Sequence, residues 1–297
     1  MRAPIASRLS SAYVLLPFAA LCWAGNHIIA RWVAGHTPPI GLNSLRWSIA
    51  TLLLLPLARV HLKNDWLALR GKLPLMLFYS LGGGALFSTL QFMALSHTVA
   101  LNAAVMNSAV PVLMLAVSWL VFGDRLSRLQ LGGILVSVTG VLVIIAKGDA
   151  ATFTRLSFNL GDLLLLLNMS LFAVYSSCLR LRPRVHPLSF LFAVSLISAV
   201  ISLPFWLGEH LAGNPLPLDF KTLVAIGYTA IFTSVLAYIA WNRGVEQIGP
   251  ARAGAFLHLV PLYGILLATT LLGETLQLFH LAGMALILAG VWLVARR

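Results

Sequence analysis

Residues 110–133 read VPVLMLAVSWLVFGDRLSRLQLGG, and residues 260–283 repeat their pattern without a gap as VPLYGILLATTLLGETLQLFHLAG. Each copy joins an apolar helix containing a proline to a turn of glycine and an acidic residue, and then to a helix marked by glycines seven positions apart. Such spacing places the glycines on one helix face, where small residues allow close helix packing. The matched pairs are Pro111/Pro261, Gly123/Gly273, Asp124/Glu274, Leu131/Leu281, Gly133/Gly283 and Gly140/Gly290.

The composition of the chain predicts a membrane protein. Of its 297 residues 60% are hydrophobic and 9% are charged, whereas soluble domains need about 25% charged residues. A helix needs about 20 apolar residues to cross the hydrocarbon core. Ten runs meet this length approximately: Tyr13–Val33, Gly41–Leu57, Leu73–Met93, Leu101–Val121, Leu129–Ala146, Leu160–Leu179, Leu188–Leu207, Thr222–Trp241, Ala253–Leu272 and Leu276–Val294.

The position of the repeat within these runs predicts its topology. Five spans separate the two copies, and because five is odd, the copies enter the membrane from opposite sides. We therefore expect an all-α polytopic membrane protein with ten transmembrane helices, built as two inverted-topology five-helix repeats. Residues 1–150 would form the first repeat and residues 151–297 the second, within one membrane domain. Inverted repeats of this kind are typical of secondary transporters, whose site lies near the midplane.

The net charge of +12 is explained by topology without a nucleic-acid partner, since positive residues accumulate in cytoplasmic loops. With both termini inside, fifteen Lys and Arg residues lie on the cytoplasmic side and four on the outer side. This distribution predicts that both termini are cytoplasmic, and we expect a multi-pass protein of the bacterial inner membrane. Arg46 lies within the second span, and we expect its side chain to reach the outer headgroups.

Three segments of the chain carry a resemblance to a known family. They are Trp23-Ala24-Gly25-Asn26, Pro111…Gly123-Asp124-Arg125-Leu126 and Pro261…Gly273-Glu274-Thr275-Leu276. They resemble the EamA family of the drug/metabolite transporter superfamily, and within it the YddG-type exporters of aromatic and other amino acids. The resemblance implies ten helices in two inverted repeats, with a cavity formed by helices 1, 3, 4, 6, 8 and 9, and it implies that helices 5 and 10 are peripheral.

Polar and aromatic residues at the middle depth of the spans are the candidate substrate ligands, because polar groups are costly in hydrocarbon. Several share a helix face at three- or four-residue spacing. Each could instead bond only a neighbouring helix, but together they come from the helices that the resemblance assigns to the cavity. The predicted cavity residues are Trp23, Asn26, His27, Tyr79, Asn102, Asn107, Asn168, Tyr175, Ser234, Tyr238, Trp241 and His258.

Candidate hinges are provided by residues that disturb helix geometry. A mid-helix proline removes a backbone hydrogen bond to the residue four positions earlier, here Asn107 for Pro111 and Leu257 for Pro261. Gly83, in a run of three glycines, similarly permits bending or close packing. The alternative for all three is a static bend.

These features favour a secondary carrier that exports amino acids, including aromatic and bulky neutral ones, and similar small metabolites by alternating access. No Asp or Glu lies mid-span, so facilitated diffusion is expected, unless His27 or His258 carries a proton. We expect no cofactor, no metal and no catalytic residues, and a monomer or weak homodimer. An intramembrane enzyme lacks a nucleophile–base pair, a channel lacks a continuous polar lining, and a sensor lacks a soluble domain.

Overall fold

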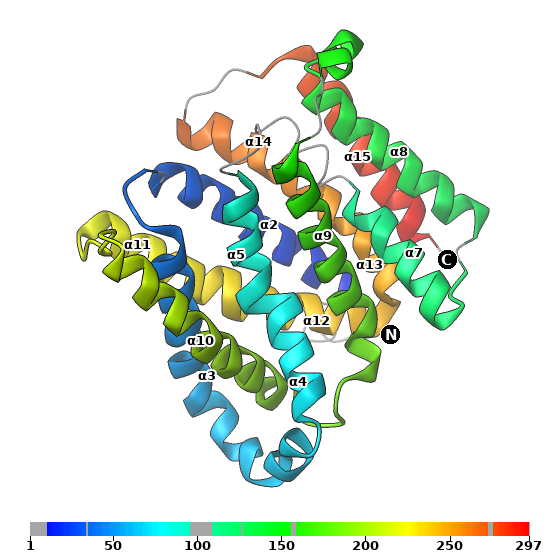
Figure 1. Cartoon of the computed structure of the whole chain (residues 1–297). Coiled ribbons are helices and arrows are strands. Elements are labelled where there is room, and N and C mark those ends of the chain that lie inside the picture. The colour runs from blue at the N-terminus through cyan, green and yellow to red at the C-terminus, as the bar shows by residue number, and fades with distance from the viewer. Residues whose placement is uncertain are drawn as a thin grey trace.

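The computed structural model of the chain describes residues 11–33, 35–95, 109–125, 127–155, 159–272 and 276–296. Every regular element in these ranges is a helix (Figure 1). The first half contributes α2 (Ala12–Val33), α3 (Pro39–Arg70), α4 (Leu73–Ser80), the π-helix η1 (Leu81–Ala85), α5 (Leu86–Leu95), α7 (Val110–Phe122), α8 (Arg128–Ile145) and the 3₁₀ helix η2 (Ala150–Arg155). The second half contributes α9 (Leu160–Cys178), the 3₁₀ helix η3 (Leu179–Leu181), α10 (Pro187–Leu211), α11 (Phe220–Tyr228), the π-helix η4 (Thr229–Leu236), α12 (Ala237–Ile248), α13 (Pro250–Ala255), the 3₁₀ helix η5 (Phe256–His258), α14 (Leu259–Leu272) and α15 (Leu278–Ala295).

The helices have the length and composition of membrane spans. Among the described residues, nine helical segments are long and apolar enough to cross a bilayer, and α7 is a shorter apolar helix. The predicted all-helical, polytopic class is confirmed. The predicted span Leu101–Val121 is described only in its second part, because residues 101–108 lie outside the described residues.

Two helices extend beyond the spans predicted from hydropathy. The second span was expected to end at Leu57, but α3 continues to Arg70 even with Pro56 inside it. The eighth was expected to end at Trp241, but helical structure continues to Ile248. A span predicted from hydropathy ends where charged residues begin, whereas the backbone hydrogen bonds of the helix continue into the interface. Both predicted ends were therefore too early as helix ends.

The packing of the helices follows the internal repeat. Two pairs join equivalent helices of the two halves, α8 with α15 and α3 with α10, and these pairs lie at opposite edges of the bundle (Figure 1). The other main contacts come in matched couples: α5–α9 with α2–α12, α7–α9 with α2–α14, and η1–α10 with η4–α3. Exchanging the halves therefore reproduces the contact pattern, as two inverted copies require.

The glycines of the repeat lie where α8 crosses α15. A Cβ atom on Gly133 would lie 2.7 Å from the carbonyl oxygen of Gly290, and one on Gly140 would lie 2.6 Å from that of Gly283. Because the first glycine of α8 meets the second of α15, the two helices run antiparallel. The predicted close-packing role of these four glycines is confirmed.

The two π-helices occupy equivalent places in the two halves. A shift of 150 positions carries residues 81–85 of η1 onto residues 231–235, which lie inside η4 (Thr229–Leu236). π-Helical segments are rare and frequently mark functional sites. The repeat thus extends in backbone conformation to a pair of helices whose sequences do not match.

Both ends of the described chain lie at one end of the bundle, here called the terminal end. There the Tyr13 hydroxyl donates a hydrogen bond to the Ala295 carbonyl oxygen (3.1 Å). The opposite end is called the distal end. Its loops are joined by an ion pair between His36 Nε2 and Asp219 Oδ2 at 2.5 Å.

Candidate functional site

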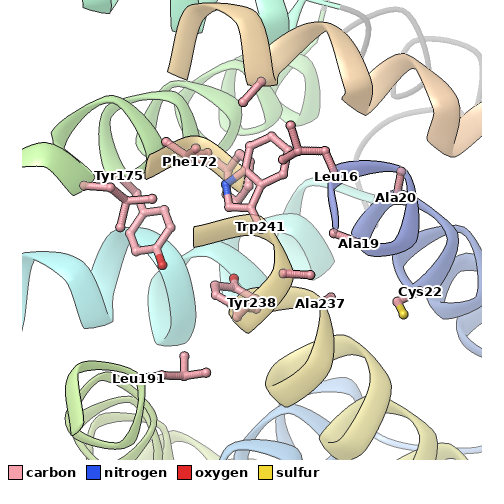
Figure 2. Close-up of a cluster of buried hydrophobic side chains, with 14 of the residues drawn as sticks. Leu16, Ala19, Ala20, Cys22, Phe172, Tyr175, Leu191, Ala237, Tyr238 and Trp241 are labelled. Atoms are coloured by element: carbon pink, nitrogen blue, oxygen red, sulfur yellow. The ribbon is translucent and has the colours of Figure 1, made fainter. Parts of the chain in front are cut away.

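The centre of the bundle is an aromatic cluster made of Trp23 on α2, Phe172 and Tyr175 on α9, and Tyr238 and Trp241 on α12. Figure 2 shows the rings of Phe172, Tyr175, Tyr238 and Trp241. The ring centroid of Trp23 lies 5.8 Å from that of Phe172, 6.0 Å from Tyr238 and 5.3 Å from Trp241. Tyr175 lies 6.1 Å from Tyr238. Edge-to-face and tilted contacts at these distances are favourable for aromatic pairs.

The polar atoms of the aromatic cluster are directed to specific partners. The Tyr175 hydroxyl donates to Asn242 Oδ1 (3.0 Å), and Trp241 Nε1 donates to Ser176 Oγ (3.2 Å). The Tyr238 hydroxyl donates to the carbonyl oxygen of Gly83 in η1. A π-helical segment of the first half and α12 of the second half are therefore tied together at the centre.

Tyr79 extends the cluster toward the terminal end. Its ring lies 5.8 Å from Tyr175 and 5.2 Å from Phe190, and its hydroxyl donates to the Cys178 carbonyl oxygen (2.5 Å). The side chain is fully buried. Tyr79 therefore packs against the aromatic cluster on the side of the terminal end.

The two polar residues that follow Trp23 on α2 lie farther toward the distal end. Asn26 Oδ1 accepts a hydrogen bond from Thr233 Oγ1 of η4 (3.5 Å). His27 is exposed. Of the predicted face of α2, only Trp23 joins the aromatic cluster.

Two predicted cavity residues are buried without a hydrogen-bond partner in the described parts of the chain. They are Asn168 on α9, with both amide atoms unpartnered, and Ser234 on η4. Buried polar groups are nearly always bonded, so each such atom requires an explanation. Ser234 precedes Tyr238 by about one helical turn, close to the cluster.

His258 lies away from the aromatic cluster. It ends η5, and its Nδ1 contacts the Ser137 hydroxyl of α8. Ala255, in the preceding helix turn, packs in a small apolar group with Ile134 and Val294. The structure therefore places this imidazole between α8 and the α13–α14 span.

The candidate hinges are described in part. Pro111 is in the first turn of α7, and Asn102 and Asn107, which precede it, lie outside the described residues. Pro261 follows the 3₁₀ turn η5, so the regular α-helix is interrupted just before it. Gly83 is the middle residue of η1.

The expected position of Arg46 was wrong. Its side chain does not extend to the headgroups, because the residue is only 8% exposed. The guanidinium carbon lies 5.0 Å from the Trp47 ring centroid, and the Trp47 ring lies 5.5 Å from that of Tyr238. A cation–π contact on the α3 side of the bundle replaces the predicted snorkelling.

Sequence reasoning missed several residues around the cluster. Trp47 and Phe87 contact its rings, and Asn242 and Ser176 accept its hydrogen bonds. The signal that could have found Trp47 is its neighbour, since a basic residue within a span is rarely exposed to lipid. Ser176 and Asn242 each directly follow a predicted site residue, and no spacing rule distinguishes them.

Two cavities open at the terminal end, on the same side of the aromatic cluster as Tyr79. One of about 670 Å³ is lined by residues that include Asp65, Arg182, Arg184, His186 and Asn242. The other, of about 620 Å³, lies beside Asp124, Arg125, Arg180 and Arg252. Between them, Arg180 pairs with Asp124, and Arg182 Nη2 lies 2.9 Å from Glu246 Oε1.

Acidic and metal-binding groups take no part in the central site as far as the structure describes it. Asp162 lies at the start of α9, where it forms a capping box with Asn159. Within the described ranges no three His, Cys, Asp or Glu side chains converge in a way that could hold a metal ion.

A helical membrane bundle of two inverted copies, with an aromatic centre where the copies meet, defines a polytopic membrane transporter. The family is established by sequence comparison: the chain belongs to the EamA-like transporter family, whose model matches residues 10–146 and again residues 159–296. The two matched segments correspond to the two copies of the repeat.

Individual relatives cover nearly the whole chain at low identity. An uncharacterized transporter of Archaeoglobus fulgidus is 29% identical over 97% of this chain and 98% of its own length. A Salmonella typhimurium protein named "Probable amino-acid metabolite efflux pump" is 27% identical over 91% and 90%. The uncharacterized inner membrane transporter YedA of Escherichia coli is 25% identical over 92% and 87%. A solved structure described as "Crystal structure of protein" shares the fold, with a TM-score of 0.80 at 20% identity over 95% of both chains.

Proposed function

We propose that this transporter exports amino acids, with aromatic and bulky neutral ones included, and similar small metabolites. The observation that carries the proposal is the aromatic cluster, buried between the two halves and built from neutral side chains. Aromatic walls with a few directed hydrogen-bond groups suit a small amphipathic solute. The Salmonella relative named as an amino-acid metabolite efflux pump supports the same substrate class.

The mechanism we propose is alternating access by facilitated diffusion. The mid-span positions that the structure describes contain no carboxylate to carry a coupling ion. Bending would occur at the symmetric π-helices η1 and η4, which include Gly83, and at Pro111 and Pro261. Helices bend where the regular hydrogen-bond ladder is interrupted, and these places adjoin the aromatic cluster or lie one helix away from it.

The direction we propose is outward from the cytoplasm of a bacterium, across its inner membrane. The excess of basic residues at the terminal end supports a cytoplasmic location for both termini. The name of the Escherichia coli relative, an inner membrane transporter, agrees with this membrane.

Flux into liposomes that contain only the purified protein tests the proposal. Radiolabelled phenylalanine, threonine and methionine should enter without an ion gradient, saturably, and faster when unlabelled substrate is present inside. Linear, unsaturable flux would indicate a channel. Absence of flux for all three amino acids, with or without a pH gradient, would refute the amino-acid assignment.

A site variant and a matched control link the flux to the aromatic cluster. Trp23→Ala removes the ring that contacts three other members of the cluster, so we expect flux to fall at least tenfold. Trp119→Ala is the control, because Trp119 is exposed on the apolar helix α7. Equal flux in the two variants would show that the aromatic cluster is not part of the transport site.

Proton-coupled efflux is the second candidate, and the position of His27 on α2, one helix turn beyond Trp23 of the aromatic cluster, favours it. An imidazole is the side chain that titrates near neutral pH without special tuning. Flux that requires a pH gradient, and that becomes independent of the gradient in His27→Gln, would establish coupling. The same test on His258→Gln separates the two histidines.

A further inference from the structure

Arg46 carries a buried charge that no carboxylate in the described part of the chain neutralises. The residue is buried, its Nε atom has no hydrogen-bond partner, and no carboxylate in the described residues forms an ion pair with it. Its guanidinium group lies over the Trp47 ring. A buried charge without a counter-charge is strongly unfavourable, so an anionic ligand at this position would be stabilised.

Further unpartnered polar atoms lie on the same face of α3. Asn43 precedes Arg46 by three positions, is 1% exposed, and has neither its Nδ2 nor its Oδ1 bonded. Trp47 Nε1, four positions after Asn43, is likewise buried without a partner. Arg46, Asn43 and Trp47 lie at three- and four-residue spacing, so they offer donors to a ligand from one side of the helix, and Asn43 Oδ1 also offers an acceptor.

The π-helix η4 is one of the elements that pack against α3. Ser234 of η4 is buried and its hydroxyl is unpartnered. About one turn farther along, Tyr238 contacts the Trp47 ring and interacts electrostatically with Arg46. The unpartnered groups of α3 therefore adjoin the aromatic cluster on the side where Tyr238 meets Trp47.

We propose that Arg46, with Asn43 beside it, is the subsite that binds the carboxylate of the transported solute. This proposal rests on the proposed function. Guanidinium groups bind carboxylates through two parallel hydrogen bonds. The acceptors Asn43 Oδ1 and Ser234 Oγ suit an ammonium group next to that carboxylate. The apolar part of the solute then lies toward Tyr238 and Trp23.

The first test compares ligands on the wild-type protein and needs no variant. Phenylalanine, 3-phenylpropanoate, phenylalanine methyl ester and 2-phenylethylamine compete against radiolabelled phenylalanine, and each is tested for thermal stabilisation of the purified carrier. The two carboxylates should bind roughly 10- to 100-fold more tightly than the ester and the amine, the range for a hydrogen bond to a charged group. Equal binding of the acid and its ester would overturn the subsite.

The second test uses substitutions on one helix. Arg46→Gln should remove the preference for carboxylates, Arg46→Lys should retain part of it, and Asn43→Leu should weaken it. Arg59→Gln, an exposed arginine farther along α3, is the matched control and should bind like the wild type. If Arg46→Gln fails to fold, the comparison of the acid with its ester and the Asn43→Leu variant still test whether the carboxylate subsite exists.

The outcomes separate this subsite from the proposed function. Flux of phenylalanine that is unchanged in Arg46→Gln would leave an amino-acid carrier and overturn the subsite. Absence of amino-acid flux, together with Arg46-dependent stabilisation by 3-phenylpropanoate, would support the subsite and refute the amino-acid assignment. Stabilisation by chloride as strong as that by carboxylates would reduce the subsite to a counter-ion position and overturn it.

Discussion

Gly83 is in direct contact with the ring of Tyr175. A Cβ atom at this position would lie 2.6 Å from the ring, whereas one on Gly82 would find its nearest neighbour at 3.4 Å. We expect Gly83→Ala to displace Tyr175 and weaken its hydrogen bond to Asn242. Flux should fall several-fold, and the free energy of unfolding should fall by about 1–3 kcal/mol, as for an overpacked core.

Gly82→Ala is the matched control for this prediction. It adds the same methyl group to the same π-helical segment without an overlap, so it should transport and unfold like the wild type. Thermal unfolding and liposome flux measure both effects. If both variants lose flux equally, the backbone of η1 is sensitive to any side chain, and the contact with Tyr175 is not the cause.

His186 couples stability to pH at the terminal end. Its Nδ1 accepts a hydrogen bond from the Leu188 N–H (3.3 Å) at the start of α10, and its ring stacks on His61 at 3.5 Å. Partial burial and the neighbouring His61 imidazole lower the pKa of His186, while Asp65 opposes the shift. The unfolded chain therefore binds a proton more readily than the folded protein.

The sign of the pH effect follows from this difference. Stability that is present above about pH 6.5, the ordinary histidine value, should decline as the pH falls through that value and level off below the lowered pKa. His186→Asn keeps a capping side chain that does not titrate, so its melting temperature should depend less on pH between 8 and 5. His210→Asn, at the exposed end of the same helix, should retain the wild-type slope, and an equal flattening there would contradict the assignment.

The contact between α8 and α15 is specified by individual glycines. A Cβ atom on Gly133 would lie 2.7 Å from the Gly290 carbonyl oxygen, but one on the adjacent Gly132 meets nothing within 4 Å. We expect Gly133→Ala to lower the free energy of unfolding by about 1–3 kcal/mol, because backbone atoms cannot move aside as side chains can.

Gly132→Ala should be neutral or stabilising by up to about 1 kcal/mol, since alanine favours a helix over glycine. Thermal unfolding of the two purified variants measures the difference. Equal melting temperatures would show that α8 and α15 can separate slightly without cost. Flux is expected to change little in either variant, because the pair lies at the edge of the bundle.

The elements differ in how far their sequence predicts them. The glycines of α8 and α15 were interpretable because a seven-residue spacing has one geometric meaning on a helix. The π-helices were not, since nothing in residues 229–236 distinguishes a π-turn from an α-turn. The positions 150 residues after Gly82–Gly84 hold no glycine run, yet their backbone is π-helical as well. Conformation there is set by packing against α3 and α2, which sequence spacing does not encode.

At the scale of the whole molecule, some of the predicted site residues meet at the centre and others do not. The difference depends on the sequence feature from which each residue was predicted. Trp23, Tyr175, Tyr238 and Trp241 meet because aromatic residues on three facing helices fill one centre. The His258 side chain contacts α8 and the Arg46 side chain is buried, because the rotation of a helix within a bundle depends on its neighbours. Polarity and depth predict that a residue is buried in the protein, but not which helix it faces.

The two ion pairs at the terminal end line the two cavities there, and one of them forms the basis of the last prediction. Arg182 joins the end of α9 to Glu246 on α12, and Glu246 is mostly exposed. An exposed pair contributes at most about 1 kcal/mol to stability. If the terminal end opens during transport, breaking this pair should shift the population of open molecules by about two- to fivefold, with little effect on melting.

Thiol labelling at Val245→Cys, a buried position that lines the larger cavity, measures this opening when Cys22 and Cys178 are replaced by alanine. Glu246→Arg should raise the labelling rate, because it places two positive charges opposite each other. The exchanged pair, Arg182→Glu with Glu246→Arg, should restore the slow rate, since the attraction is regained with the charges reversed. Fast labelling in the exchanged pair would mean that the cavity opens for reasons unrelated to this contact, and equal slow labelling in all three would mean that the terminal end does not open here.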